Sequence, residues 1–303
     1  MKEEESLRKA LAELNTLTGL NLSMEKQPED MSAAAEKISL ITEAYREKNS
    51  KTSYLQKLLA GRLSTAEIYS QAVRFHVPPE EKRAVFVIET KNVSDENILT
   101  VLKQLFMTKT HDFAMMADEL RLVLIKSLKE DEGDESLRIT AHTIVDMLNT
   151  EAMARVRVGY GNVIHDISEM PVAYREARLS LEIGRIFYIG ENVIRYSRLG
   201  IGRLIYQLPE DTCRLFLSEV FGQKMQVSFD DETVATINTF FDNNLNISET
   251  ARQLYVHRNT LVYRLEKIHQ ATGLDIRVFE DAMTFKIASM VAAYLKDKEE
   301  TTK

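Results

Sequence analysis

The sequence contains little of what disulfide-stabilised, membrane-spanning or secreted proteins require. Cys213 is the only cysteine among 303 residues, so no intramolecular disulfide can form and a reducing compartment is expected. No apolar run approaches the ~18 residues that a transmembrane helix needs. The first residues, MKEEESLRKALAEL, are charged and lack the apolar centre of a signal peptide. These features predict a cytoplasmic protein with no membrane partner.

Positively charged side chains are outnumbered by negatively charged ones. Lys and Arg number 39 against 46 Asp and Glu, which gives a formal net charge of −7. Bulk attraction therefore cannot carry this chain to nucleic acid, and any such binding must come from a local face. The length is enough for two or three modest domains, and the balance of 44% hydrophobic and 28% charged residues is that of a globular protein.

Several enzyme signatures are missing as well. There is no Gly-rich phosphate loop, no GxSxG elbow and no Cys/His metal spacing. His165 and Asp166 follow an expected strand and could form an acid–base pair. Adjacent side chains on a loop usually diverge, however, so solvated loop residues are the favoured interpretation. The GYG at 159–161 is interpreted as a strand-end turn. We expect no catalytic residue, no bound metal and no cofactor.

Hydrophobic periodicity divides the chain into three regions. Residues 1–77 form a helical N-terminal region, residues 78–200 alternate strand and helix, and residues 201–303 return to helix. The middle region reads β-α-β-β-α-β-α-β. Its strands are expected at 84–89, at two places within 112–127, at 154–161 and at 192–197, and its helices at 95–107, 136–150 and 169–187. One α+β sheet domain satisfies this order. The last residues, KDKEETTK, are expected to fray.

The helical N-terminal region admits a weak heptad pattern from Met31 onwards. Its apolar seam would contain Ile38, Ile41 and Leu55, although charged residues occupy two of the seam positions. Two interpretations remain open, an amphipathic helix packed on its own domain and a helix that joins two copies. For a dimer, the segment Met31–Leu59 is the predicted contact surface.

The stretch ISETARQLYVHRNTLVYRLEKI, residues 247–268, has the apolar spacing of a helix-turn-helix. Asn246 can cap the first helix, with Glu249 completing a capping box. Tyr255 holds the turn position at which many helix-turn-helices have glycine. Gly273 is expected to end the second helix. The expected packing residues are Ile247, Ala251, Leu254, Val256, Leu261, Leu265 and Ile268.

Seven polar residues are left outward by this packing. They are His257, Arg258, Asn259, Thr260, Tyr263, Arg264 and Lys267. Most lie in the first turns of the second helix, where a recognition helix meets base edges. Arg and Asn can make bidentate contacts to guanine and adenine, and first-turn amides suit a phosphate. The helix at 258–270 is therefore predicted to bind double-stranded DNA.

A helical hairpin with a solvated polar face is the alternative. Residues 232–303 contain nine Lys and Arg against ten Asp and Glu, which favours that alternative slightly. Residues 257–268 contain three cations against one anion, which favours DNA. Short motifs produce false positives, so spacing alone leaves both interpretations standing.

The sequence HRNTLVYRLEKI, followed by TGLDIRVFEDAMTFKIA, resembles the C-terminal helix-turn-helix of the PucR/CdaR family of bacterial transcriptional regulators. The earlier pieces RVRVGYGN and AYREARLSLEIG resemble that family's middle domain, a degenerate relative of the GGDEF diguanylate cyclase fold. The resemblance spans roughly residues 50–295. It implies a GGDEF-like, ferredoxin-like α+β domain between a helical N-terminal region and an all-α DNA-binding domain.

The resemblance also bears on function. Regulators of this family are dimers that bind DNA and answer to small metabolites, so it implies a homodimer, a two-fold symmetric operator and a small-molecule effector. The short N-terminal region matches no sensing domain of longer members, so the resemblance does not indicate which effector. A second function class stays open, a nucleotide- or metabolite-binding module whose helix-turn-helix serves protein interaction.

The cyclase motif itself is replaced. Met116-Ala117-Asp118-Glu119-Leu120 stands where an active cyclase has Gly-Gly-Asp-Glu-Phe. The two glycines let backbone approach a nucleotide phosphate, which Met116 and Ala117 cannot copy. The paired acids could hold Mg²⁺, but they are also common in polar turns. We expect a domain that has kept the fold and lost the chemistry.

Overall fold

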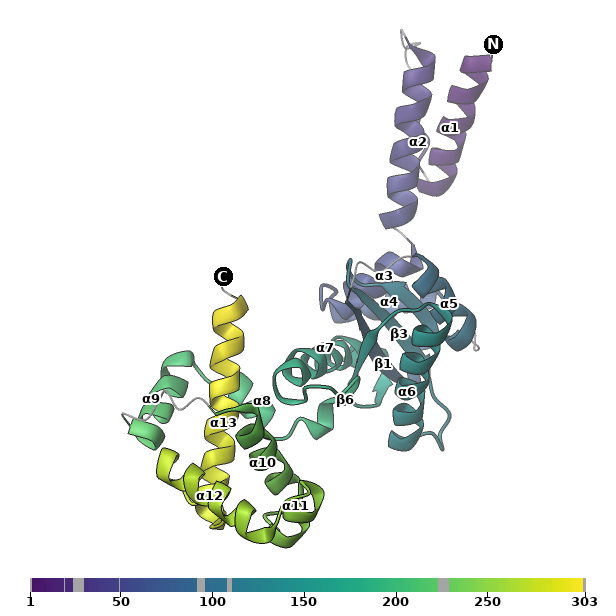
Figure 1. Cartoon of the computed structure of the whole chain (residues 1–303). Helices are drawn as coiled ribbons and strands as arrows, with labels where there is room; N and C mark the ends of the chain where they lie inside the picture. The colour runs from purple at the N-terminus through teal and green to yellow at the C-terminus, as the bar shows by residue number, and fades with distance from the viewer. Residues whose placement is uncertain are drawn as a thin grey trace. The chain divides into compact units, whose positions relative to one another are not determined.

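The computed structural model describes residues 2–18, 20–23, 30–48, 50–91, 96–107, 111–222 and 229–301 (Figure 1). The chain forms two compact units. The first contains residues 1–181 and 191–197, and the second contains residues 182–190 and 198–303. The expected mixture of a sheet domain with helical regions on either side in sequence is confirmed, and the fold class is α+β. Within the described ranges, no helix combines the length and apolarity that crossing a bilayer needs.

The N-terminal region is helical, as predicted. Its helices are α1 (Lys2–Thr18), α2 (Met31–Lys48), α3 (Lys51–Leu59) and α4 (Thr65–Arg74). Figure 1 shows α1 and α2 side by side, and small and aliphatic side chains such as Leu7, Leu14 and Ala35 are buried there.

The predicted apolar seam from Met31 to Leu59 is wrong in its second half. Ser50 starts a new helix, because its side-chain oxygen accepts the backbone N–H of Ser53 at 3.0 Å. Leu55 is 2% exposed and belongs to the core of the first unit. Ile41 on α2 is 56% exposed and remains available to a partner.

The sheet has the order β2-β3-β1-β4-β6, with a short strand β5 also paired to β1. Strand β1 is antiparallel to both β3 and β4, and β4 is parallel to β6. The order of strands and helices expected from the sequence is confirmed apart from β5. The bounds of the strands are β1 Glu80–Thr90, β2 Phe113–Met116, β3 Arg121–Ser127, β4 Val156–Tyr160, β5 Ile164–Asp166 and β6 Val193–Arg195.

Three helices pack on the sheet: α5 (Glu96–Phe106), α6 (Asp134–Glu151) and α7 (Met170–Phe187). Residues 84–88 of β1 are fully buried, so both faces of the central strand are covered. Phe86 and Ile88 form one core with Leu102 of α5 and Ile144 of α6. Side chains alternate along a strand, and α7 lies against the opposite face.

Gly159 lets α7 approach the sheet closely. The expected strand-end turn at 159–161 is wrong for its first two residues, because Gly159 and Tyr160 lie within β4. A Cβ atom built on Gly159 would lie 2.3 Å from the carbonyl oxygen of Ala177 and 2.8 Å from Leu181 Cγ. The glycine is therefore a packing residue between strand and helix.

The expected loop at His165 and Asp166 is also wrong, since both residues belong to β5. The Asp166 carboxylate accepts hydrogen bonds from the Tyr69 hydroxyl and from the Ser168 backbone N–H, each at 2.8 Å. It caps the 3-10 helix η1 (Ile167–Glu169). Asp166 thus ties the end of β5 to α4, and His165 is exposed beside it.

The second unit contains the C-terminal helices, with a core that includes Phe240, Leu265 and Phe285. Its helices are α8 Gly202–Tyr206, α9 Glu210–Phe221, α10 Asp231–Asp242, α11 Ile247–Gln253, α12 Arg258–Thr272 and α13 Phe279–Thr301, and the 3-10 helix η2 (Tyr196–Arg198) precedes them in the chain.

The expected frayed tail is wrong, because α13 continues to Thr301. Arg214 pairs with Glu299 at 2.9 Å, and Lys298 lies over the ring of Tyr294.

Candidate nucleic-acid interface

Helix α11 begins at the predicted cap. The Asn246 side-chain oxygen accepts the backbone N–H groups of Ser248 at 3.0 Å and Glu249 at 3.1 Å. The reciprocal half of the expected capping box is absent here. The Glu249 carboxylate instead accepts from Arg252, and the Asn246 N–H donates to the Asn243 carbonyl.

The turn between α11 and α12 has a left-handed residue that is not glycine. Tyr255 has φ 55°, a conformation that disfavours an L-residue by roughly 1–2 kcal/mol. Its side chain is 96% exposed, so packing does not stabilise it there. The next residue, Val256, is partly buried in the core, and its N–H donates to the Ala251 carbonyl at 3.0 Å. The turn therefore directs one side chain inward and presents an aromatic ring to solvent.

The inward face of α12 is confirmed. Leu261, Leu265 and Ile268 are buried, and they share a core with Ala251 of α11. The helix ends two residues later than expected, at Thr272, and Gly273 terminates it with φ 86°. These contacts fix which side of α12 faces away from the unit.

That outer side contains six of the seven predicted residues. They are all exposed: His257, Arg258, Asn259, Thr260, Tyr263 and Lys267. The Lys267 ammonium lies over the Tyr263 ring at 4.8 Å, which directs one cation and one aromatic side chain to the same surface. The arrangement presents donors, a hydroxyl and an aromatic ring along almost three turns of a helix.

His257 has a structural role that the sequence did not indicate. It is the N-cap of α12, and its Nδ1 accepts the Asn259 backbone N–H at 3.2 Å. Histidine is not among the preferred capping residues, so no sequence rule pointed to this role. His257 also accepts through its backbone, since its carbonyl oxygen takes the Thr260 N–H at 2.9 Å and the Leu261 N–H at 3.2 Å. His257 thus fixes the first turn of α12 through both its side chain and its backbone.

Arg264 differs from the other six. Its guanidinium donates to the carboxylate of Glu232 and to the hydroxyl of Thr236 at 3.3 Å, both on α10. The Arg264 side chain is 22% exposed. The structure therefore places Arg264 at the edge of the outer face, attached to the neighbouring helix.

The acidic start of α10 also lies near this face. Asp230 caps α10 by accepting the Thr233 N–H at 2.8 Å. Hydrogen bonds from Thr233, aided by the positive charges of Lys267 and Arg264, hold the pKa of Asp230 below its usual range. Asp230 and Glu232 thus offset part of the positive charge, and a binding partner must be recognised by geometry as well as by charge.

The replaced cyclase motif forms a tight hairpin between β2 and β3. The Asp118 carboxylate accepts the Leu120 N–H at 3.0 Å and lies 3.5 Å from Arg121. Its oxygens are thus engaged within the turn itself. Among the described residues, no group of three or more His, Cys, Asp and Glu side chains is arranged to hold a metal ion.

Comparison with known families matches two parts of the chain. A model of the PucR C-terminal helix-turn-helix domain matches residues 233–291, which contain α11 and α12. A model of a GGDEF-like domain matches residues 60–183, which contain β1 to β5. Both agree with the resemblance seen in the sequence.

Three relatives illustrate the similarity. The purine catabolism regulatory protein of Bacillus subtilis (strain 168) is 28% identical over 134 residues, which are 44% of this chain and 25% of that protein. The carbohydrate diacid regulator of Escherichia coli (strain K12) is 21% identical over 243 residues, 77% of this chain and 63% of that protein. The DNA-binding transcriptional activator AdeR of Bacillus subtilis (strain 168) is 25% identical over 260 residues, 82% of this chain and 61% of that protein. The chain thus spans between 25% and 63% of the length of these relatives.

Proposed function

The chain belongs to the PucR/CdaR family of transcriptional regulators, and from that premise we propose that it binds a two-fold symmetric DNA operator as a homodimer through α12. Members of this family are DNA-binding transcriptional regulators, and we take that function as the starting point. The contacts, the symmetry and the control by a metabolite are our proposals.

The exposed face of α12 carries the proposal. Arg258, Asn259 and Thr260 project from the first turn of a helix whose opposite face is buried. An α-helix fits the major groove of B-DNA, and Arg and Asn side chains there can discriminate base pairs. Tyr263, about one turn further on, and Lys267, about two turns further on, are placed to contact sugar and phosphate.

We propose a dimer because a single helix-turn-helix would bind DNA only weakly. One helix-turn-helix covers few base pairs, and a chain of net charge −7 gains little from non-specific attraction. Joining two copies raises the effective concentration of the second at its half-site. The half-sites should then lie about one helical turn, or a multiple, apart. The exposed Leu40 and Ile41 of α2 offer an apolar contact for such a pair.

The middle domain serves regulation in this proposal. Its hairpin lacks the glycines of a cyclase, and Asp118 bonds within its own turn. We assign it no catalysis and place the protein in the cytoplasm. Two relatives are named for purine catabolism and for carbohydrate diacids, and a small metabolite is the class of effector that we propose for this chain.

Fluorescence anisotropy of the full chain with labelled DNA from upstream of its own gene tests the proposal. We expect saturable binding that unlabelled upstream DNA displaces and shuffled DNA of the same composition does not. Lys296→Ala, an exposed cation on α13, is the matched control and should leave binding unchanged. Equal displacement by both competitors would reject sequence-specific recognition, and no binding at all would favour a helix-turn-helix that contacts protein.

A further inference from the structure

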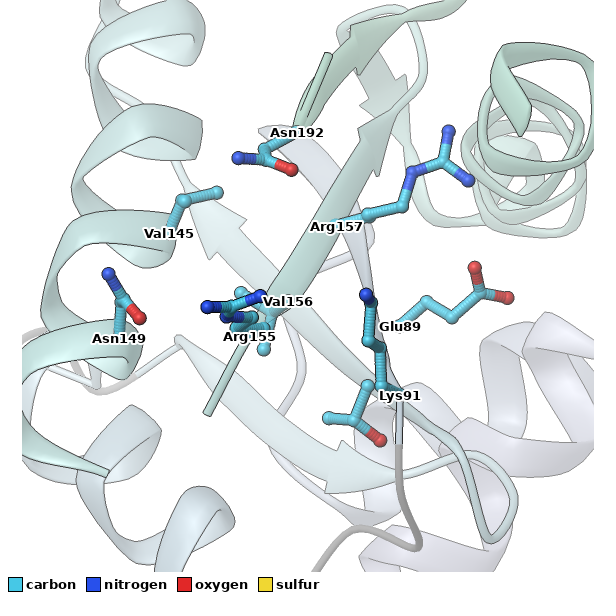
Figure 2. A pocket seen from close by; sticks show the side chains of 9 residues that line it. Glu89, Lys91, Val145, Asn149, Arg155, Val156, Arg157 and Asn192 are labelled. Carbon is cyan, nitrogen blue, oxygen red and sulfur yellow. The ribbon is translucent and has the colours of Figure 1, made fainter. Parts of the chain in front are cut away.

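A pocket of about 360 Å³ opens at the end of the sheet where β1 finishes and β4 begins, within the first compact unit (Figure 2). Its walls come from the end of β1, the C-terminal part of α6, the start of β4 and the loop before β6. The pocket shares no residue with the 116–120 hairpin or with α12. Neither the family matches nor the relatives assign it a role.

Backbone pairing explains why these segments meet. Glu89 and Arg157 face each other across the antiparallel β1–β4 pair, so the end of β1 lies beside the start of β4. The Val158 N–H donates to the Asn192 carbonyl at 2.7 Å, which brings the loop before β6 to the same place. At the end of α6, the Leu148 carbonyl accepts the N–H groups of Ala152 and Ala154, which turns the chain towards β4.

Four of the side chains that line this space are amides or cations. Figure 2 shows Asn149 projecting from α6 towards the strands, with Arg155 facing the same space from the start of β4. Lys91 comes from the end of β1 and Asn192 from the opposite side. Val145 and Val156 supply the apolar part of the wall.

The charge balance of the lining is positive. The lining contains three cations, Lys91, Arg155 and Arg157, and one carboxylate, that of Glu89. Glu89 accepts from Arg121 at 3.4 Å, so its charge is offset outside the pocket. Within the described part of the chain, Lys91 and Arg155 form no ion pair. Two cations, one just after β1 and one just before β4, therefore line the same concave space with no ion-pair partner among the described residues.

We propose that this pocket binds a small anionic metabolite through a phosphate or carboxylate group. Arg155 presents a planar fork that matches either group, and Lys91 adds a point charge. Asn149 and Asn192 offer amide donors and acceptors to the polar remainder of the ligand. The volume lies at the small end of ligand sites, which favours a molecule no larger than a sugar phosphate or a small diacid. The use of this site to control DNA binding rests on the proposed function.

Isothermal titration calorimetry of the full chain tests the site directly. The probes are inorganic pyrophosphate and succinate at constant ionic strength, because salt screens exposed charges. We expect at least one probe to bind the wild type, and Arg155→Gln and Lys91→Gln each to weaken it by about tenfold or more, as expected for a lost charge-assisted hydrogen bond. Which probe binds distinguishes a phosphate ligand from a carboxylate ligand.

Lys103→Gln, an exposed cation on α5 outside the pocket, is the control and should bind the probe as the wild type does. No binding of either probe, or equal binding by wild type and Arg155→Gln, would overturn the proposal. Fluorescence anisotropy with labelled DNA on the same samples tests the DNA-binding function separately from the anion site. A chain that binds the probe through Arg155 but binds no DNA would retain the anion site and reject the proposed function.

Discussion

The Arg264 guanidinium on α12 donates one hydrogen bond to the Glu232 carboxylate and a second to the Thr236 hydroxyl, both on α10. Of the seven residues that the sequence pointed outward, this one spans the gap between two helices. Because these bonds join α12 to α10 in the free protein, Arg264 can fix the orientation of α12 before DNA binds. Direct contact with DNA remains a prediction for this residue, and the two roles differ in what they predict for stability.

We expect Arg264→Ala to lower the free energy of unfolding by about 1 kcal/mol, because the bond and the packed stem are both lost. The double-mutant cycle with Glu232→Ala should give a coupling of about 0.2–1 kcal/mol, the range for partly exposed ion pairs. Urea denaturation of the full chain measures both. Arg258→Ala is the control, since Arg258 is exposed and should change stability little. Identical effects of the two arginine variants, with no coupling, would remove the positioning role.

Base reading belongs to the first turn of α12. We expect Asn259→Ala and Arg258→Ala each to weaken operator binding by about 1–3 kcal/mol if each makes a bidentate base contact. Circular dichroism should not change, because neither side chain is buried. Competition with non-specific DNA separates base reading from phosphate contact, since loss of a base reader reduces discrimination. Unaltered operator affinity in both variants would show that α12 is not the reading helix.

The dimer is tested at α2. We expect Ile41→Asp to shift the full chain from dimer to monomer, because it introduces a charge into an apolar contact. Ile41 is exposed within the chain, so the fold of the monomer should survive. Light scattering at micromolar concentration reports the mass, and Ser39→Asp on the same helix is the control for added charge. A wild type that is monomeric and still binds a single half-site tightly would contradict both the dimer and this surface.

The middle domain should be catalytically silent. Incubation of the full chain with GTP and Mg²⁺ is expected to give no cyclic dinucleotide above background, since Met116 and Ala117 replace the glycines that admit a phosphate. Chromatography of the products measures this directly. Turnover that disappears in Asp118→Ala would overturn the assignment and would make the hairpin an active site.

Local patterns predicted those parts of the fold that depend on local physics. The alternation of strand and helix, the buried stretch 84–88 and the apolar face of α12 all follow from periodicity. Asn246 and Gly273 mark the ends of helices, since capping is a property of a few adjacent residues. Ser50, a serine directly before a helical run, is also a local start signal, and it separates α3 from α2.

The remaining features depend on contacts that no local pattern contains. Glu232 lies 32 residues before Arg264, and only the packing of α10 on α12 brings them together. The pocket gathers residues from four segments, so neither its charge nor its shape appears in any one of them. The end of α13 was expected to fray because its composition is charged, but ion pairs with distant parts of the second unit hold it. The candidate DNA face was predictable because one amphipathic helix contains nearly all of it.

The close packing of α7 on β4 restricts position 159 to glycine. A Cβ at this position would overlap the backbone of α7, and backbone cannot move aside as a flexible side chain can. At Gly133, by contrast, an added Cβ meets no atom within 4 Å. In a library of single variants selected for abundance, position 159 would keep glycine while position 133 would diversify. The same contact limits how relatives can diverge, because a larger residue at 159 would require α7 to be repositioned together with every side chain that packs beneath it.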